Sequence, residues 1–259
     1  MDRRIKLETI GNCRDLGGLR GADGKTVRPG LLLRAAMLGH ASDDDLRVLR
    51  DEHRLDTVID LRTITESDQR PDRLIDGIGL IHIPVLDERA AGITHERTTT
   101  PRELRPILPY DMCGMYRTIV GGEAERKNLA RAMTAVLGHD FARGAVLWHC
   151  SEGKDRCGLV AALSLGALGV SREDIFEDYL MTNEVNLPKA QGYYDRVLAV
   201  GRTVAEAEII RDVYLAKAEY LEAAMEVVEG QYGGVVPYLL NGLGLSRQLL
   251  SDFRASALD

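Results

Sequence analysis

Short apolar runs alternate with amphipathic stretches along the first part of the chain. Three runs are rich in β-branched residues and predict strands buried on both faces of a sheet: 55–61 (LDTVIDL), 79–85 (GLIHIPV) and 144–149 (GAVLWH). A further apolar run, GLLLRA at 30–35, precedes a helix that Ser42 is expected to cap, with three aspartates in its first turn. Strands that alternate with helices predict an α/β fold with parallel strands at the centre of its sheet.

Beyond Gly158 the pattern is helical almost to the end of the chain. Ser171 and Asp174 are spaced as a capping box, Pro188 is expected to open a helix, and the long Ala/Glu-rich segment 203–229 continues the helical pattern. We therefore predict a single domain, 1–259, in which 159–259 form a mainly helical layer. The stretch 88–109 is rich in threonine and proline without a steady period, which predicts a loop or lid.

Composition narrows the class of protein. With 259 residues, 45% of them apolar, the chain can bury one large core. Its net charge of −7 argues against nucleic acid as a partner, so an anionic substrate would need a local positive site. Four cysteines without a signal-like start predict reduced thiols and a cytoplasmic protein, although export without a cleaved signal stays open. The apolar stretch 158–170 is too short for a membrane span, and nothing in the sequence predicts the oligomeric state.

The segment 144–170 carries the chemistry. A buried strand runs into His149 and Cys150, a short loop leads to Arg156, and an apolar helix follows. Backbone N–H groups in such a turn, together with the helix dipole, form an anion cradle, and Gly153 and Gly158 suit its tight geometry. A cysteine at its floor is expected to ionise near neutral pH, and the arginine to hold two phosphoryl oxygens. The spacing Cys-x5-Arg alone arises often by chance, and a buried cysteine is frequently only a small apolar residue.

The loop sequence HCSEGKDRCG resembles the HCxxGKDRxG signature of the cysteine-dependent protein tyrosine phosphatase superfamily. It is most similar to the atypical bacterial members, which include triple-specificity phosphatases acting on phosphotyrosine, phosphoserine/threonine and phosphoinositides. Further segments resemble the family in order along the chain: NCRDLGG (12–18), RPGLLLRAAML (28–38), VIDLRTITE (58–66), EDYLMTN (177–183) and YGGVVPYLLNGLGLS (232–246).

This resemblance implies a tyrosine phosphatase-like central sheet with parallel core strands flanked by helices and a helix-rich C-terminal part. It implies a phosphatase that hydrolyses phosphate monoesters through a phosphocysteine intermediate, releases inorganic phosphate and takes a phosphorylated protein or a phosphoinositide as its substrate. Rhodanese-like sulfur transfer and arsenate reduction also use a cysteine in an anion cradle, but they do not explain the other matching segments.

The resemblance also assigns roles to the loop. Cys150 is the expected nucleophile and Arg156 the phosphate clamp, and the substrate-binding part of the loop consists of Ser151, Glu152, Gly153, Lys154 and Asp155. Lys154 adds a charge that in this superfamily accompanies activity on phosphoinositides. Glu152 opposes it, because a carboxylate at the rim disfavours highly phosphorylated head groups.

Hydrolysis needs an acid to protonate the leaving oxygen. Asp87, in the loop after the predicted strand 79–85, is the first candidate, although it could be only a solvated loop residue. Asp155 is the alternative. Asp60 is expected to be a structural partner for an arginine, and His149 to orient the loop. His82 is expected to lie in the core.

Two departures from the family pattern affect this prediction. Cys157 stands where a serine or threonine is usual, and its weaker hydrogen bond could slow the second step. Two sulfurs this close could also form a protective Cys150–Cys157 disulfide. With Glu152, this motivates an alternative, a pseudophosphatase that binds phosphorylated ligands. We interpret Cys13 as a change in packing only, and we expect Cys113 to be a buried, inert thiol. The histidines lack metal-ligand spacing, so we expect no metal and no organic cofactor.

Overall fold

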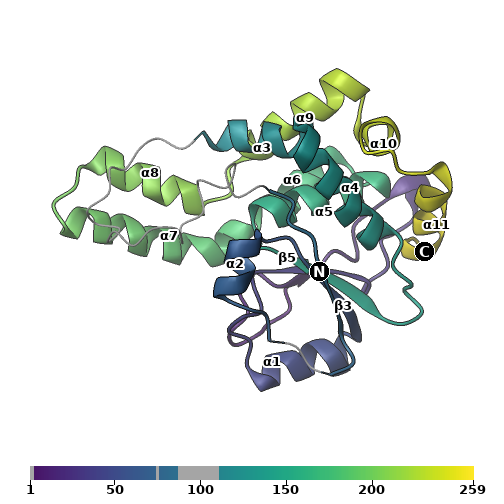
Figure 1. The fold of residues 1–259 in the computed structure, drawn as a ribbon, viewed down its shortest axis with the longest axis horizontal. Helices are drawn as coiled ribbons and strands as arrows, with labels where there is room; N and C mark the ends of the chain where they lie inside the picture. The colour runs from purple at the N-terminus through teal and green to yellow at the C-terminus, as the bar shows by residue number, and fades with distance from the viewer. Residues whose placement is uncertain (1–2, 74–75, 87–110) are drawn as a thin grey trace.

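In the computed structural model, which describes residues 3–73, 76–86 and 111–259, a sheet lies between helices on both of its faces (Figure 1). Within these residues the sheet has five strands in the order β1-β2-β5-β3-β4. All neighbours pair in parallel except β1 and β2. The expected α/β fold with a parallel centre is therefore confirmed. The strands are β1 Arg14–Asp15, β2 Leu32–Ala35, β3 Leu55–Asp60, β4 Gly79–His82 and β5 Ala145–His149.

Strand β5 is the central strand, and its carboxyl end sets the position of the site. His149 is paired in register with Ala35 of β2 on one side and with Asp60 of β3 on the other. Because these strands are parallel, their last residues meet at one edge of the sheet. Ligands of open parallel sheets bind beyond this edge.

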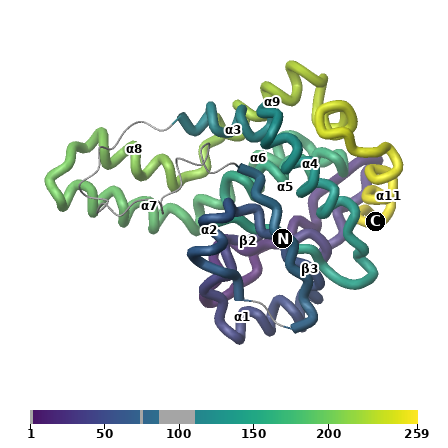
Figure 2. Tube along the Cα trace, in the orientation of Figure 1, coloured from purple at the N-terminus to yellow at the C-terminus, as the bar shows by residue number. Residues whose placement is uncertain are grey.

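The helices are distributed over the two faces of the sheet and beyond it (Figures 1 and 2). Their bounds are α1 Asp43–Arg47 with a π turn over Val48–Glu52, α2 Ile64–Gln69, α3 Met112–Gly121, α4 Glu123–Leu137, α5 Asp155–Ala167, α6 Arg172–Leu180, α7 Thr182–Ala199, α8 Val204–Tyr214, α9 Ala218–Tyr232, α10 Val235–Pro237 with a π turn over Tyr238–Gly242, and α11 Arg247–Ala257.

Alternate side chains of β5 enter two separate cores, because successive residues of a strand point to opposite faces. Val146 and Trp148 pack into the larger core with α3, α4, α5 and α9. Ala145 and Leu147 pack into the smaller core with α1. The prediction that all three apolar runs are buried on both faces is wrong for β4, which is the edge strand and leaves Leu80 largely exposed.

The predicted helix caps and the mainly helical chain beyond Gly158 are confirmed, but the bounds of some helices differ from the prediction. Ser42 and Ser171 cap α1 and α6 as expected, each accepting a hydrogen bond from the backbone three residues on. Pro188 does not open a helix but lies inside α7. The segment 203–229 is helical, as predicted, and is divided into α8 and α9 where the chain turns extended at Leu215 and Lys217. Figure 2 shows α7 and α8 as a hairpin that projects from the body of the molecule.

Among the described helices, none combines the length and apolar character that crossing a bilayer requires.

Candidate active site

The loop between β5 and α5 runs from Cys150, directly after the strand, to Asp155, the first residue of the helix. Gly153 has φ +65°, a conformation that side chains disfavour. A Cβ there would lie 2.6 Å from the carbonyl oxygen of Ala35. The expectation that this glycine serves a tight turn is met, since the loop passes too close to β2 for any side chain.

The carbonyl groups of the loop point outward and are held by the surrounding chain. The side-chain amide of Asn12 donates to the carbonyls of Glu152 (3.1 Å) and Gly153 (2.9 Å). Arg34 also donates to the carbonyl of Gly153, at 2.8 Å, and the backbone of Met37 donates to that of Ser151. Carbonyls that point outward leave the opposite N–H groups to face the interior of the loop, as a phosphate cradle requires.

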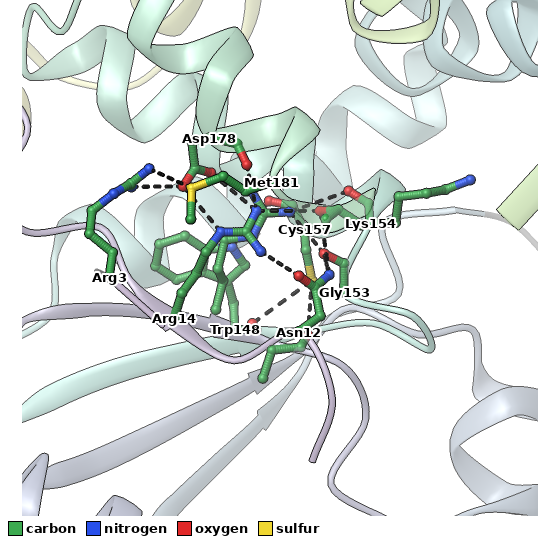
Figure 3. Close-up of polar contacts among 12 residues, drawn as sticks. Arg3, Asn12, Arg14, Trp148, Gly153, Lys154, Cys157, Asp178 and Met181 are labelled. Carbon is green, nitrogen blue, oxygen red and sulfur yellow. Dashed lines mark hydrogen bonds and ion pairs between the residues drawn. The ribbon is translucent and has the colours of Figure 1, made fainter. Parts of the chain in front are cut away.

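A buried cluster of charges holds this frame in place (Figure 3). Asp178 of α6 forms ion pairs with Arg3 (2.8 Å), Arg14 (3.1 Å) and Arg34 (2.9 Å). Burial would raise the pKa of Asp178, but the three guanidinium groups hold it well below its usual range. Three cations against one carboxylate leave a positive excess beneath the loop. The site thus supplies locally the positive charge that the acidic chain lacks overall.

The sequence alone gave Asn12, Arg14, Arg34 and Asp178 no predicted role, although they lie in segments that resemble the family. Asn12 and Arg14 lie in NCRDLGG, Arg34 in RPGLLLRAAML and Asp178 in EDYLMTN. The structure brings the three segments together around one loop. The resemblance of these segments to the family was the feature of the sequence that could have identified these residues.

Cys150 is buried at the floor of the loop. A hydrogen bond from Cys157 and the charge of Arg156 outweigh burial and lower the pKa of the Cys150 thiol from 9.0 to about 5. Cys157 thus stands near Cys150 at the position where the family usually has a serine or threonine. We therefore expect the Cys150 thiol to be ionised at neutral pH.

This thiolate predicts an acid limit of activity near pH 5. The reactive form exists above the pKa, so kcat/KM should be level at neutral pH and fall about tenfold per unit below pH 5. Alkylation of Cys150 by iodoacetamide should follow the same curve. Cys113 is an internal control, because burial and Glu219 raise the pKa of its thiol. Alkylation of Cys150 that begins only near pH 9 would contradict the assignment.

Arg156 is oriented by Glu66, a residue that sequence reasoning did not single out. The two side chains form a bidentate pair at 2.6 and 2.9 Å, and Ser151 donates to the same carboxylate at 2.6 Å. Glu66 belongs to a capping box with Thr63 at the start of α2, which turns its carboxylate back toward the loop. Burial would raise the pKa of Glu66, but Arg156 and these hydrogen bonds lower it to about 2.

Lys154 and Glu152 do not point into the loop in this conformation. The Lys154 ammonium is buried and donates to the carbonyls of Val213 (2.5 Å) and Leu215 (3.3 Å) at the end of α8. Figure 3 shows its side chain leading away from the cluster of buried charges. Glu152 is paired with Lys189 of α7 at 2.5 Å. Both loop charges thus connect the loop to the α7–α8 hairpin.

The two candidate acids differ in what the structure shows. Asp155 accepts a hydrogen bond from the Tyr116 hydroxyl at 2.7 Å and lies 3.2 Å from the Lys154 ammonium. Asp87 and the predicted lid 88–109 lie outside the described residues.

Two further predictions concern residues near the end of the sheet. Asp60 pairs with Arg62, which confirms the expected arginine partner. His82 is only partly buried on the edge strand, so its expected place in the core is wrong.

The four cysteines are all free. Cys13 is buried, as a packing role implies, whereas Cys113 is partly exposed, contrary to expectation. Cys157 is fully buried, and its thiol faces the carbonyl of Ala35 at 3.6 Å as well as the Cys150 sulfur.

We predict that hydrogen peroxide links Cys150 to Cys157. Peroxide oxidises the Cys150 thiolate to a sulfenic acid, and the Cys157 sulfur then displaces water to form the disulfide. Mass spectrometry of peptides should show the linked pair, lost on reduction. In Cys157→Ser, Cys150 should instead advance to sulfinic acid. Sulfinic Cys150 without a linked peptide in the unaltered protein would contradict this prediction.

A low-pKa cysteine under an N–H-lined loop, at the carboxyl edge of a parallel sheet, is the arrangement of the cysteine-dependent phosphatases. The chain belongs to the tyrosine phosphatase family, whose sequence profile matches residues 5–259. It is 34% identical to a Cupriavidus necator protein provisionally named a tyrosine-protein phosphatase, over 92% of this chain and 84% of the relative. It is 30% identical to the triple specificity protein phosphatase PtpB of Mycobacterium tuberculosis, over 90% and 92%.

The protein is thus a phosphatase, and these matches give no support to the alternative of a pure binding module. Among solved structures, PTPMT1 in complex with PI(5)P resembles the chain weakly, with a TM-score of 0.36 and 12% identity over 71% of this chain and 90% of the other.

Proposed function

We propose that the protein hydrolyses phosphotyrosine and phosphoserine/threonine monoesters, and phosphoinositides more slowly, through a phosphocysteine on Cys150. The single observation that carries the proposal is the Cys150 thiol, with a pKa of about 5, lying at the floor of a loop whose Ser151, Glu152 and Gly153 carbonyls are held by the surrounding chain. The nucleophile and the anion-binding groups therefore meet at one point.

The reaction has two steps. The Cys150 sulfur attacks phosphorus, the P–S bond forms, and the P–O bond to the leaving group breaks while an acid protonates the departing oxygen. Water then attacks the phosphocysteine with help from the same group as a base, which releases inorganic phosphate and restores the thiolate. Arg156 holds two equatorial oxygens in both transition states.

The expected order of substrates by rate follows from the ion pairs and hydrogen bonds of the two charged loop residues, Lys154 and Glu152. A multiply phosphorylated head group needs cations beyond the cradle, but the Lys154 ammonium is committed to backbone carbonyls of α8. The Lys189 ammonium near the loop is likewise committed, because it is paired with Glu152 at 2.5 Å. The relative PtpB is named for triple specificity, which supports a wide range of monoesters. These observations favour singly phosphorylated protein substrates.

The test is the initial rate of phosphate release from a phosphotyrosine peptide, a phosphoserine peptide and soluble phosphoinositides with one or three phosphates. We expect the peptides to be faster and the triply phosphorylated lipid slowest. Equal or faster release from that lipid would overturn the substrate order. No release from reduced protein that still binds phosphopeptide would overturn the function.

Asp87 is the proposed general acid. Asp87→Asn should lower kcat by about 10²- to 10³-fold with a peptide substrate, but far less with an aryl phosphate whose leaving group needs no proton. Asp155→Asn, the matched control for the alternative, should lower both rates similarly if it only holds the loop. The opposite pattern would assign the acid to Asp155.

A further inference from the structure

An ion pair between Glu152 and Lys189 joins the loop that holds Cys150 to helix α7. The Lys189 ammonium lies 2.5 and 2.7 Å from the two carboxylate oxygens of Glu152. The side chain of Glu152 is 25% exposed and that of Lys189 is 43% exposed, so a ligand that enters the loop can meet both. The reaction described above uses neither charge, although Glu152 is only two residues from the nucleophile.

Other contacts hold both partners of this ion pair in place. The carbonyl of Glu152 accepts a hydrogen bond from the Asn12 side chain at 3.1 Å, which restrains the backbone of Glu152. The Lys189 ammonium lies 5.6 Å from the centre of the Tyr214 ring, a distance typical of a cation–π contact. The Tyr214 ring is itself stacked on Tyr193 of α7, with 4.3 Å between the ring centres. Because both charges are already positioned, they lose less side-chain entropy on pairing than an ordinary surface pair does.

This ion pair cancels a positive charge beside the phosphate-binding loop. Among the described residues, Glu152 supplies the only carboxylate that pairs with Lys189. A second phosphate on a substrate would have to displace this carboxylate and would then lie beside it, where like charges repel. Without the carboxylate, the Lys189 ammonium would remain over Tyr214 as an unpaired cation.

A peptide substrate can bring a second phosphate to this place. Two residues of a chain span at most about 7 Å, which limits the separation of the Cα atoms of Cys150 and Glu152. In an extended peptide, residues two positions apart project to the same side and are also about 7 Å apart. A peptide whose first phosphate lies over Cys150 can therefore carry a second phosphate close to Glu152 and Lys189.

We propose that Glu152 and Lys189 form a specificity filter against peptides that carry a second phosphate near the phosphorylated residue. The proposal rests on the proposed function of the loop as the phosphate-binding site. Lys189 is a potential binding site for the second phosphate, and the Glu152 carboxylate occupies it. The protein therefore selects singly phosphorylated segments of its protein substrates.

The filter is tested with two phosphotyrosine peptides that differ only in a second phosphotyrosine, two positions from the first. Dissociation constants are measured by calorimetry in the Cys150→Ser background, so that no peptide is hydrolysed. With Glu152 in place, the second phosphate should not tighten binding. In Glu152→Gln it should tighten binding about fivefold, because the Lys189 ammonium is free to pair with it. This gain should be lost in Glu152→Gln/Lys189→Gln, where the cation is absent.

The control is Glu123→Gln on α4, which changes the net charge equally by removing the carboxylate of an exposed ion pair with Lys127. It should leave the ratio of the two dissociation constants unchanged. The gain in Glu152→Gln should also shrink when the NaCl concentration is raised from about 50 to about 500 mM, because salt screens the new contact.

Three results would overturn the filter. The first is tighter binding of the doubly phosphorylated peptide while Glu152 is in place. The second is a gain that persists in the double variant, since repulsion by Glu152 would then be the whole effect. The third is equal binding of both peptides by every form. If no form binds even the singly phosphorylated peptide, the proposed function itself fails, and the filter fails with it.

Discussion

Replacing Cys150 with serine is expected to lower kcat by at least about 10⁴-fold on every substrate. The serine hydroxyl is nearly the same size but stays protonated, because an alcohol is a far weaker acid than a thiol, and a phosphoserine would not be displaced readily by water. The loop and Arg156 remain, so the variant should still bind phosphate monoesters. Steady-state phosphate release and calorimetric titration with a phosphopeptide measure the two effects separately.

A matched control is Cys113→Ser, which changes a partly exposed cysteine on α3 and should keep kcat within about twofold. Acid quenching during turnover should also trap phosphate on the peptide that contains Cys150 in the unaltered protein. A rate in Cys150→Ser within tenfold of the unaltered protein would show that the nucleophile lies elsewhere.

Arg156→Lys should have the second largest effect, a loss of about 10³-fold in kcat/KM. A lysine keeps the charge but cannot donate two parallel hydrogen bonds to the phosphoryl oxygens, whose charge grows in the transition state. It also cannot form the bidentate pair with Glu66 that fixes the arginine at 2.6 and 2.9 Å. Because the interaction is strongest in the transition state, kcat should fall more than KM rises.

The control for this prediction is Arg117→Lys on α3, where the arginine is exposed and its ion pair with Glu226 is loose at 3.7 Å. It should leave both kinetic constants unchanged. If Arg156→Lys lowers kcat/KM less than tenfold, the bidentate contact does not stabilise the transition state, and the phosphate is bound by the backbone N–H groups alone.

Local patterns predicted the parts of the fold that depend on neighbours in sequence. The apolar run before Cys150 became the central strand because burial stabilises apolar side chains on both faces of a strand. Ser42 and Ser171 cap helices because a cap needs only the backbone three residues on. A similar local rule predicted that Pro188 opens a helix, which is wrong. Its position inside α7 indicates that packing offsets the missing hydrogen bond.

The residues of the candidate site also fall into two groups: those that a local pattern predicts and those that it does not. The sequence by itself determined the strand, the tight glycine turn and the helix that form the loop between Cys150 and Arg156, and its resemblance to the family assigned the expected roles of these two residues. The partners of that loop lie far from it along the chain. Glu66 contacts Arg156 across 90 residues, and Arg34 contacts Asp178 across 144.

Only the tertiary structure decided those pairings and the direction of Lys154. The physical reason is burial. A charge removed from water must find an opposite charge or a hydrogen bond within about 3 Å, and the choice among 33 basic and 40 acidic side chains depends on which of them the packed elements bring together. No periodicity along the chain records that choice, whereas the residues that form the cradle follow one another in order.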